Sequence, residues 1–431
     1  MAESDTIFAV ATGAGRAAVA VLRLSGPAAG TVIAALCGGL PPARRASLRT
    51  LRDAGGEPLD RGLVLWLPGP GSYTGEDSAE LHVHGGPAVV DGLSDRLVEL
   101  GARPAEPGEF TRRAFLNERM DLVQAEAVAD LVAAETSAQR RQALQQLGGA
   151  LGAIHAGWSA RLLRLLAQQE ALIDFADEPL PPATEAAMLT DIAALRDEIT
   201  HHLADDRRGE RLREGLVFAV AGAPNVGKST LINALAGREA AIVSPVPGTT
   251  RDVLEVRVAL GGVPVMLLDT AGLRDTDDAV EAEGVRRARA RAAAADLTIV
   301  VRDARAETAA EPSGSRCLLV ASKADLGGQD GTADVRVSAL TGQGMNRLRR
   351  MLAEIARDLT ASAGPPAVTR ARHRAALTEA AAALQGALTA DWPELRGEEL
   401  RRALLALGRV TGRLGVEDVL DSIFSQFCIG K

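Results

Sequence analysis

Residues 216–229 have the sequence LVFAVAGAPNVGKS. The apolar run 216–221 predicts a buried strand, and the glycine-rich segment behind it matches the pattern GxxxxGKS. The next residues, 230–235, read TLINAL and predict a helix. Glycines let backbone N–H groups wrap around phosphates, and a helix N-terminus adds partial positive charge. The stretch therefore predicts a phosphate site in which Lys228 reaches the β- and γ-phosphates and the Ser229 hydroxyl binds Mg²⁺.

Two further motifs predict the rest of a phosphate site. The apolar strand 265–268 ends in Asp269-Thr270-Ala271-Gly272, which puts a carboxylate near the magnesium and a glycine N–H near the γ-phosphate. Residues 247–252, PGTTRD, lie between the two motifs and offer a second hydroxyl, that of Thr250, to the magnesium. Such a segment is typical of a switch loop that orders around a nucleotide.

A base-recognition motif follows the strand 317–321 and reads Ser322-Lys323-Ala324-Asp325. The Asp325 carboxylate can accept hydrogen bonds from guanine N1–H and N2–H, a donor pair that adenine lacks. Lys323 is expected to lay its aliphatic stem over the base, and residues 338–340, Ser338-Ala339-Leu340, to give a backbone N–H to guanine O6. Together these motifs predict a GTPase domain.

Two positions depart from the usual GTPase pattern. Ser322 replaces the asparagine of NKxD, and the shorter serine is expected to weaken a contact to the base edge or phosphate loop or pass it to water. Leu273 follows the DTAG motif, where Ras-like enzymes carry a glutamine that orients the attacking water. Because leucine cannot polarise water, the water-orienting group must come from elsewhere.

Composition narrows the class of protein. The 431 residues are 47% hydrophobic and 24% charged, which suggests two to four globular domains. The formal net charge of −8 excludes a global positive field for nucleic acid, so any RNA contact needs local basic patches. Three distant cysteines without a CxxC pair argue against a disulfide framework or zinc cluster. With an acidic N-terminus and no membrane-length apolar run, we expect a cytoplasmic protein without membrane contact.

The fold class expected is multidomain α+β, in four consecutive segments. Residues 1–117 predict an α+β domain, with strands at 19–24, 62–67 and 80–84 and a helix at 86–100. Residues 118–213 and 363–431 predict two helical parts. Between them, residues 214–362 alternate strands and helices, which is typical of a parallel sheet. An α/β domain thus interrupts a helical one.

With these motifs in hand, the whole chain resembles the MnmE (TrmE) family of tRNA-modification GTPases, in the TrmE-Era-EngA-like group. Beyond the GTPase motifs, the resemblance rests on Gly75-Glu76-Asp77, on His84-Gly85-Gly86-Pro87, on 107–117 (PGEFTRRAFLN) and on the terminal Cys428-Ile429-Gly430-Lys431. It implies a folate-binding α/β N-terminal domain, a discontinuous helical domain and an inserted Ras-like P-loop G domain. It also implies a homodimer whose G domains pair across the nucleotide face and need K⁺.

The resemblance implies the remaining site residues of the G domain. Potassium ligands would be the Asn225 side chain, backbone carbonyls of residues 244–250, chiefly of Ser244 and Val246, and an oxygen of Thr249. A monovalent cation there can neutralise transition-state charge as an arginine finger does. Glu281 matches the family's catalytic glutamate; the residues alone give it no preference over the four other acids nearby. The expected nucleotide set comprises Asn225, Val226, Gly227, Lys228, Ser229, Thr230, Ser244, Pro245, Val246, Pro247, Gly248, Thr249, Thr250, Asp269, Thr270, Ala271, Gly272, Lys323, Asp325, Ser338, Ala339 and Leu340.

Folate contacts follow from the resemblance as well. Arg23, Glu80 and Arg119 match the family's folate positions, with Lys431 arriving from the chain end, and the folate would be 5-formyl- or 5,10-methylene-tetrahydrofolate. Without the family, Arg23 and Glu80 read as ordinary strand-end charges. His82 and His84 share one strand face and, with no third ligand in view, read as packing or hydrogen-bonding residues.

The activity implied is GTP hydrolysis in tRNA modification. With the FAD-dependent partner MnmG, as a heterotetramer, such a protein adds a carboxymethylaminomethyl or aminomethyl group to C5 of wobble uridine 34. Cys428 would take part in the tRNA chemistry, although a small apolar side chain explains it equally well. One alternative is a ribosome-assembly GTPase, which would carry an RNA-binding module such as KH. Another is a signalling switch that needs an external activating protein.

Overall fold

The computed structural model describes residues 5–174, 182–205, 207–237, 255–269, 292–305, 316–328, 332–361, 366–412, 417–425, 427 and 430. The chain divides into two compact units. The first comprises Met1–Val132, Gln146–Ile192 and Ala382–Lys431, and the second comprises Ala133–Gln145 and Ala193–Ala381. Both units are therefore built from segments that are far apart in the sequence.

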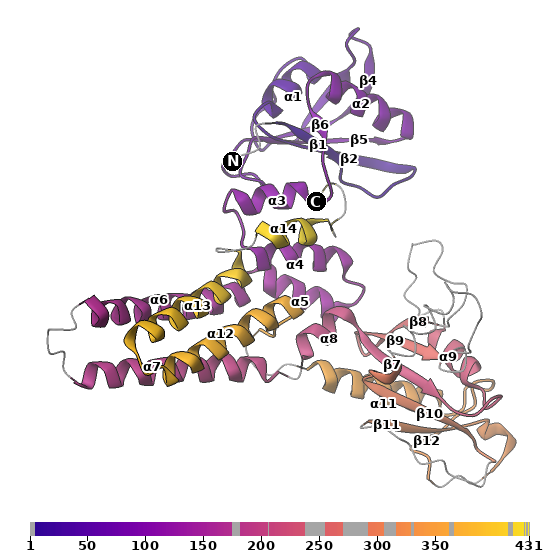
Figure 1. Cartoon of the computed structure of the whole chain (residues 1–431). Coiled ribbons are helices and arrows are strands. Elements are labelled where there is room, and N and C mark those ends of the chain that lie inside the picture. Colours follow the sequence, from indigo (N-terminus) through magenta and orange to yellow (C-terminus); the bar gives the residue numbers. More distant parts are fainter. Residues whose placement is uncertain are drawn as a thin grey trace, which may run out of the picture. The chain divides into compact units, whose positions relative to one another are not determined.

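The first unit contains a six-stranded sheet of order β3-β4-β5-β2-β1-β6. Most of its strands are labelled in Figure 1. Its strands pair antiparallel except β6, which runs parallel to β1. They are β1 (Ile7–Val10), β2 (Ala17–Ser25), β3 (Ser47–Arg52), β4 (Pro58–Leu67), β5 (Ser78–Gly85) and β6 (Arg103–Pro104). Helices α1 (Ala29–Cys37) and α2 (Pro87–Glu99) bury their apolar residues against the sheet. The strands expected at 19–24, 62–67 and 80–84 and the helix at 86–100 are thus confirmed.

The helices of the first unit come from both ends of the chain. They are α3 (Glu109–Leu116), α4 (Leu122–Ala133), α6 (Ala150–Asp174), α13 (Pro393–Thr411) and α14 (Glu417–Phe424). Helix α6 packs along α13, and the Gln169 side chain donates a hydrogen bond to the Pro393 carbonyl at 2.9 Å. Near the end of the chain, Phe424 and Phe427 pack with Leu122. A helical region on either side of an α/β segment is therefore present.

The second unit contains a sheet of order β12-β11-β10-β7-β9-β8. All neighbours in it are parallel except β8, which is antiparallel to β9. The strands are β7 (Leu216–Ala221), β8 (Glu255–Leu260), β9 (Val263–Asp269), β10 (Leu297–Asp303), β11 (Cys317–Ser322) and β12 (Val335–Arg336). Its helical elements are α8 (Arg208–Glu214), α9 (Lys228–Ala236), the short 3₁₀ turn η2 (Ala324–Leu326) and α11 (Met345–Thr360). Parallel strands joined by crossovers confirm the α/β expectation for this part of the chain.

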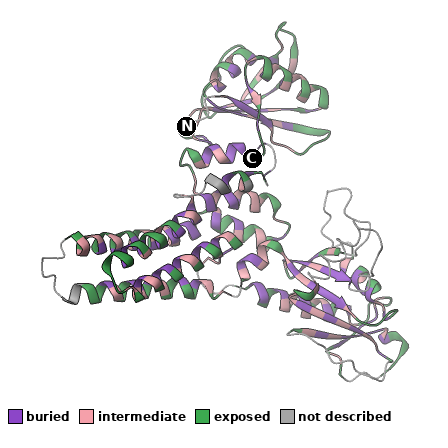
Figure 2. Cartoon of the chain, viewed as in Figure 1, coloured by how far each residue is buried: buried purple, intermediate pink, exposed green. Residues whose placement is uncertain are grey.

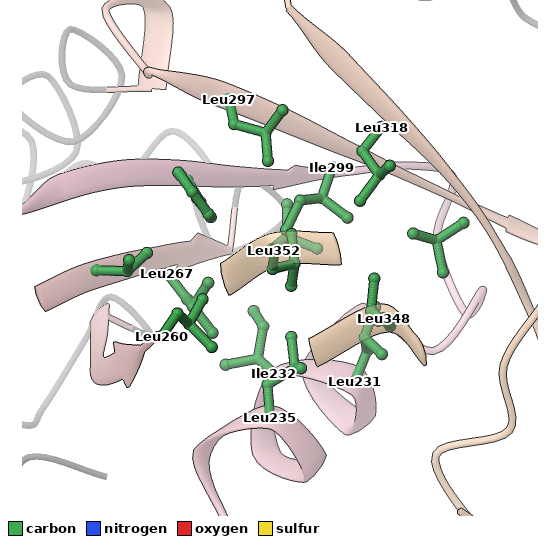
Figure 3. Packing of buried hydrophobic residues seen from close by; sticks show 14 of the residues in the cluster. Leu231, Ile232, Leu235, Leu260, Leu267, Leu297, Ile299, Leu318, Leu348 and Leu352 are labelled. Atoms are coloured by element: carbon green, nitrogen blue, oxygen red, sulfur yellow. The ribbon is translucent and has the colours of Figure 1, made fainter. Parts of the chain in front are cut away.

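The core of this sheet explains why α9 and α11 form where they do. Apolar residues recur at helical spacing along α11, and Leu348 and Leu352 are among those on its buried face. Figure 3 shows these side chains meeting Ile232 of α9 and Leu267 and Ile299 of the sheet. The same strands are mostly buried in Figure 2, as expected for strands of a parallel sheet. This packing fixes the N-terminus of α9 at the carboxyl edge of β7.

Among the described residues, helices α5 (Ser137–Leu147), α7 (Pro182–Leu203) and α12 (Ala371–Thr389) each have residues in both units. Within the described residues, no helix has both the length and the apolar character needed to cross a membrane.

Candidate functional site: the carboxyl edge of the parallel sheet

The phosphate loop joins β7 to α9 through residues with unusual backbone angles. Gly222 has φ +150°, and a Cβ there would lie 2.2 Å from the Val301 carbonyl oxygen, so only glycine fits. Asn225 and Gly227 also have positive φ, of 62° and 94°. Lys228, the first residue of α9, is only 5% exposed, and its ammonium donates to the carbonyls of Gly222 and Ala223 at 2.9 and 2.8 Å. The loop thus wraps around a buried positive charge, as a phosphate cradle requires.

Ser229 and Asp269 form the second part of the site. β7 and β9 are neighbours whose register sets Val220 beside Asp269, so the acid ends its strand next to the phosphate loop. The Ser229 hydroxyl donates to Asp269 Oδ2 at 2.8 Å, and Asp269 is buried. Both groups are oxygen ligands of the kind that Mg²⁺ prefers when phosphates and waters complete its shell. In the described part of the chain, no cluster of three or more His, Cys, Asp or Glu side chains suggests an all-protein metal site.

The base-recognition motif is tied directly to the phosphate loop. Lys323 has φ +57°, and its ammonium donates to the Asn225 carbonyl at 2.9 Å and to Asp303 Oδ2 at 3.0 Å. The Ser322 hydroxyl lies 2.6 Å from the Val226 carbonyl and 2.8 Å from that of Arg302. Of the two contacts that serine was expected to weaken, the contact to the phosphate loop is present, because β11 brings the short, buried side chain close to Val226. A weaker contact to the base edge stays a prediction.

Asp325 and the SAL segment lie beside this motif. Asp325 is exposed on η2, where a carboxylate is open to a base. Ser338 is buried, and its backbone N–H donates to the Gln343 carbonyl at 2.9 Å. The candidate donors to guanine O6 are therefore the N–H groups of Ala339 and Leu340. The side chain of Leu340 is 86% exposed, so this turn is held by its backbone rather than by packing.

Several predicted residues lie outside the described residues. These are the segment 244–250, with Ser244, Pro245, Val246, Pro247, Gly248, Thr249 and Thr250, then Thr270, Ala271 and Gly272, and also Glu281, Cys428 and Lys431. The described residues bring together Asn225, Val226, Gly227, Lys228, Ser229, Thr230, Asp269, Lys323, Asp325, Ser338, Ala339 and Leu340 at one edge of one sheet.

A second group of predicted residues lies on the sheet of the first unit. Arg23 and Glu80 face each other across β2 and β5, and two guanidinium N–H groups donate to Glu80 Oε1 at 2.9 and 3.2 Å. The Arg23 guanidinium carbon also lies 5.6 and 5.9 Å from the ring centres of Tyr73 and Phe110. His82 Nε2 is 3.4 Å from the second oxygen of Glu80. Arg23 and Glu80 therefore form an ion pair that packs against two aromatic rings, and they are not two separate charges at strand ends.

Arg119 and the end of the chain border this sheet too. Arg119 is exposed, and its stem lies close to Gly75, where a Cβ would be 3.2 Å from Arg119 Cγ and Cδ. Gly430, with φ +93°, lies so close to the end of β1 that a Cβ would be 2.8 Å from the Val10 carbonyl oxygen. His84 hydrogen bonds to Asp60 at 2.8 Å, so both strand histidines are hydrogen-bonding residues, as expected.

Sequence reasoning missed three contributors to these sites: Asp303, Tyr73 and Phe110. Asp303 closes the apolar strand 297–303, and an acid at the end of a parallel strand was the available signal. Tyr73 and Phe110 left no comparable signal, because an aromatic residue in a loop or helix is most often packing.

Comparisons with known proteins show which family the chain belongs to. Residues 6–119 match the family model "GTP-binding protein TrmE N-terminus", and residues 122–428 match the model "MnmE helical domain". Curated relatives named "tRNA modification GTPase MnmE" include that of Gluconacetobacter diazotrophicus, 60% identical over 100% of this chain and 99% of the relative. The relative from Acidiphilium cryptum is 55% identical over the full length of both.

Solved structures with similarity include the G domain of the T. maritima FeoB iron transporter. It is 27% identical and covers 33% of this chain and 98% of its own, with a TM-score of 0.22. A GTP-binding protein of Sulfolobus solfataricus in complex with GDP is 14% identical, covers 63% and 78%, and has a TM-score of 0.24. Scores this low support no functional conclusion. The family models and the full-length relatives, together with the nucleotide site, are sufficient: the chain belongs to the MnmE family of tRNA modification GTPases.

Proposed function

We propose that this chain hydrolyses GTP as a tRNA modification GTPase and, with an FAD-dependent MnmG partner, adds a carboxymethylaminomethyl or aminomethyl group to C5 of wobble uridine 34. The observation that carries the proposal is the nucleotide edge of the parallel sheet. There Lys228 is buried in a glycine loop, the Ser229 hydroxyl pairs with Asp269 at 2.8 Å, and Lys323 joins the base motif to the loop.

The nucleotide roles follow from these contacts. Lys228 would exchange its two loop carbonyls for phosphate oxygens, since an ammonium binds charged oxygens more strongly than neutral ones. Ser229 and Thr250 would supply hydroxyl ligands to Mg²⁺, with Asp269 beside them. Asp325 would select guanine over adenine. A bound Mg²⁺ would neutralise charge on the phosphates.

Potassium and Glu281 complete the proposed hydrolytic machinery. Asn225 is exposed on the loop, so its amide oxygen is open to a cation, and its carbonyl is held by Lys323. The carbonyls of Ser244 and Val246 and an oxygen of Thr249 would be the other ligands, and Glu281 would orient the attacking water in place of the glutamine absent at Leu273. Two copies of the chain would pair across their nucleotide faces to complete this site.

A tetrahydrofolate site is proposed on the sheet of the first unit, and the donor set fits it. A pterin edge offers N–H donors to a carboxylate such as Glu80, and a glutamate tail offers carboxylates to cations such as Arg23, Arg119 and Lys431. Arg23 and Glu80 already pair, so a ligand here meets an oriented charge pair rather than two mobile side chains. Bound 5-formyl- or 5,10-methylene-tetrahydrofolate would supply the one-carbon unit.

The second face of this sheet supports the proposed homodimer. Val19, Leu48 and Leu63 are 52%, 51% and 42% exposed, while α1 and α2 bury the opposite face. A half-apolar sheet face of this kind is typical of an interface. The domain boundaries proposed are 1–117 for folate binding and dimerisation, 118–213 and 363–431 for the helical domain and 214–362 for the G domain. Cys428 would serve the tRNA chemistry, in the cytoplasm where tRNA and GTP are available.

The decisive experiment is mass spectrometry of wobble nucleosides in a strain lacking this protein. Complementation with the wild-type chain should restore the modified uridine, whereas Asp269→Asn, which neutralises the partner of Ser229, should not. Unchanged wobble nucleosides in the deletion strain would contradict the proposal and favour the ribosome-assembly reading.

A further inference from the structure

Asp303 ends β10 at the sheet edge that carries the base motif. β10 and β11 are parallel, and their register sets Asp303 beside Ser322, the last residue of β11. Lys323 follows in the left-handed backbone region. Because parallel strands bring their carboxyl ends to one edge, an acid at the end of one strand meets the residue that follows the other.

The Lys323 ammonium is held from two directions. Asp303 Oδ2 lies 3.0 Å from Nζ on one side, and the Asn225 carbonyl oxygen lies 2.9 Å away on the other. The first acceptor belongs to a strand and the second to the phosphate loop. A lysine side chain anchored at both its backbone and its tip retains few rotamers, so the four-carbon stem is fixed between these two elements.

Arg305 keeps the Asp303 carboxylate oriented and charged. Its guanidinium donates to Oδ1 at 2.9 Å and to Oδ2 at 2.7 Å, and its backbone N–H donates to Oδ1 at 3.1 Å. These hydrogen bonds, with that of Lys323, hold the pKa of the Asp303 carboxyl well below its usual value. Asp303 is therefore a permanent anion for the lysine.

We propose that Asp303 is a positioning residue of the guanine-nucleotide site, which fixes the Lys323 ammonium against the Asn225 carbonyl so that the lysine stem is ordered before the base arrives. The inference rests on the proposed function, in which this motif binds guanine. Ordering a side chain in advance removes an entropic cost of binding. Loss of Asp303 therefore weakens nucleotide binding and leaves the chemistry of the bound state nearly intact.

The test compares the release of a fluorescent GDP analogue from the full-length wild-type chain and from Asp303→Asn. We expect release about tenfold faster in the variant, the effect of losing one charge-assisted hydrogen bond. At saturating GTP, kcat should change by less than about twofold. Asp303→Glu, which keeps the charge, should recover part of the slow release. Asp334→Asn is the matched control: it removes a carboxylate that accepts the Leu319 N–H in the same sheet, and release should stay as in wild type.

A double-mutant cycle separates positioning from a general structural role. In a Lys323→Met background, Asp303→Asn should add nothing, because its effect passes through the lysine. Wild-type release rates in Asp303→Asn, or an equal effect in both backgrounds, would overturn the proposal. If the wild-type chain itself binds no guanine nucleotide, the proposed function fails instead, so the two failures are distinguishable.

Discussion

Ser322 shows how one side chain can replace another in a nucleotide site. A serine hydroxyl reaches less far than an asparagine amide, yet here it contacts the Val226 carbonyl at 2.6 Å. The contact exists because Ser322 is the buried last residue of β11 and not part of a loose loop. Serine lacks a second polar atom that could contact the edge of the base. Asp325 therefore remains the residue that we propose recognises guanine.

Ser322→Ala tests this contact. The substitution removes the one hydroxyl hydrogen that the buried Val226 carbonyl and the partly buried Arg302 carbonyl share. A buried acceptor that loses its partner costs about 1–3 kcal/mol, so we expect lower stability and faster GDP release. Urea unfolding and stopped-flow release measure the two effects. Ser94→Ala, which removes a hydroxyl bonded within α2, is the control, and an equal effect in both variants would remove the role given to Ser322.

Glu281→Ala tests the proposed source of the water-orienting carboxylate. We expect GTP turnover to fall by about 10²- to 10⁴-fold, the usual contribution of a positioned acid or base, while GTP affinity stays nearly constant. Single-turnover hydrolysis and equilibrium binding measure the two quantities. Glu283→Ala, a nearby acid, should behave like wild type. A large loss of affinity would instead indicate a structural role for Glu281.

The site was predictable where chemistry demands a fixed spacing. Lys228, Ser229 and Asp269 stand in motifs whose order reflects the phosphates that they serve, and the structure brings them together. The acid at the end of the strand 297–303 was a local signal for Asp303, but its pairing was not predictable, because Lys323 is 20 residues away and only the register of β10 with β11 joins the two. Pairwise contacts between strands carry no local sequence signal.

At the level of elements, α3 is tied to the beginning of the chain by a charge network. The Glu109 carboxylate accepts hydrogen bonds from Arg103 and Arg113 and from the Glu106 backbone N–H. Arg113, only 2% exposed, also bonds to Asp5. Burial by itself would raise the pKa of Glu109, but these hydrogen bonds outweigh it and lower the pKa to about 2. The charged form is therefore the one that stabilises the fold.

This shift predicts an acid-sensitive first unit. A glutamate with an unfolded pKa of about 4.3 and a folded value of about 2 contributes stability that is complete above pH 4.3 and lost as the pH falls through 2. Glu109→Gln should therefore lower the free energy of unfolding by on the order of 2 kcal/mol at pH 7, and the difference from wild type should shrink below pH 4. Urea midpoints at pH 7 and pH 3.5 measure it, with the exposed Glu99→Gln as control. A difference independent of pH would contradict the assigned charge.

Helix α8, which leads directly into β7, is held by Arg374 of α12. The Arg374 guanidinium donates to Glu210 at 2.9 Å, to Asp205 at 2.7 Å and to the Leu203 carbonyl at 2.8 Å. Glu210 is 2% exposed, so its negative charge is stabilised by hydrogen bonds from Arg374 and Arg207. Arg374 thus connects α12 to α8 and to the residues just before it, which lead into strand β7 of the parallel sheet.

Arg374→Met should therefore be strongly destabilising. It leaves the buried Glu210 carboxylate short of one cation, and breaking a buried pair costs about 3–5 kcal/mol. Chemical denaturation of the full chain measures the loss. Arg350→Met, an exposed arginine on α11, should change stability by less than about 0.5 kcal/mol. Equal losses in both variants would show that the Glu210 contact is not what matters.

Elements with apolar periodicity were predictable, and polar edge strands were not. The buried strands β7, β9 and β11 have continuous apolar runs, whereas the edge strand β3 reads SLRTLR and has polar side chains at four of its six positions. An edge strand with exposed charges resembles a loop, because its conformation comes from pairing with β4. The conformation of such edge strands is determined by pairing with a neighbouring strand, and a local sequence pattern does not contain that information.

At the scale of the whole molecule, we expect the bound nucleotide to determine whether two copies of the chain pair. GDP with aluminium fluoride in potassium buffer should drive two copies to pair through their nucleotide faces, because the cation completes charge neutralisation there. Spectroscopic distances between spin labels on the two nucleotide domains should shorten in potassium and stay long in sodium. Equal distances in both salts would remove the potassium assignment at Asn225.

The pairing of α6 with α13 has a consequence during synthesis. Gln169 and its partner Pro393 are separated by 224 residues, so at ribosomal speeds of about 5–20 residues per second α6 waits roughly ten to fifty seconds for α13 to emerge. The inserted nucleotide-binding segment is made within that interval and can condense first. Until α13 emerges, the face of α6 that packs along it stays exposed, which raises the risk of contacts with other nascent chains.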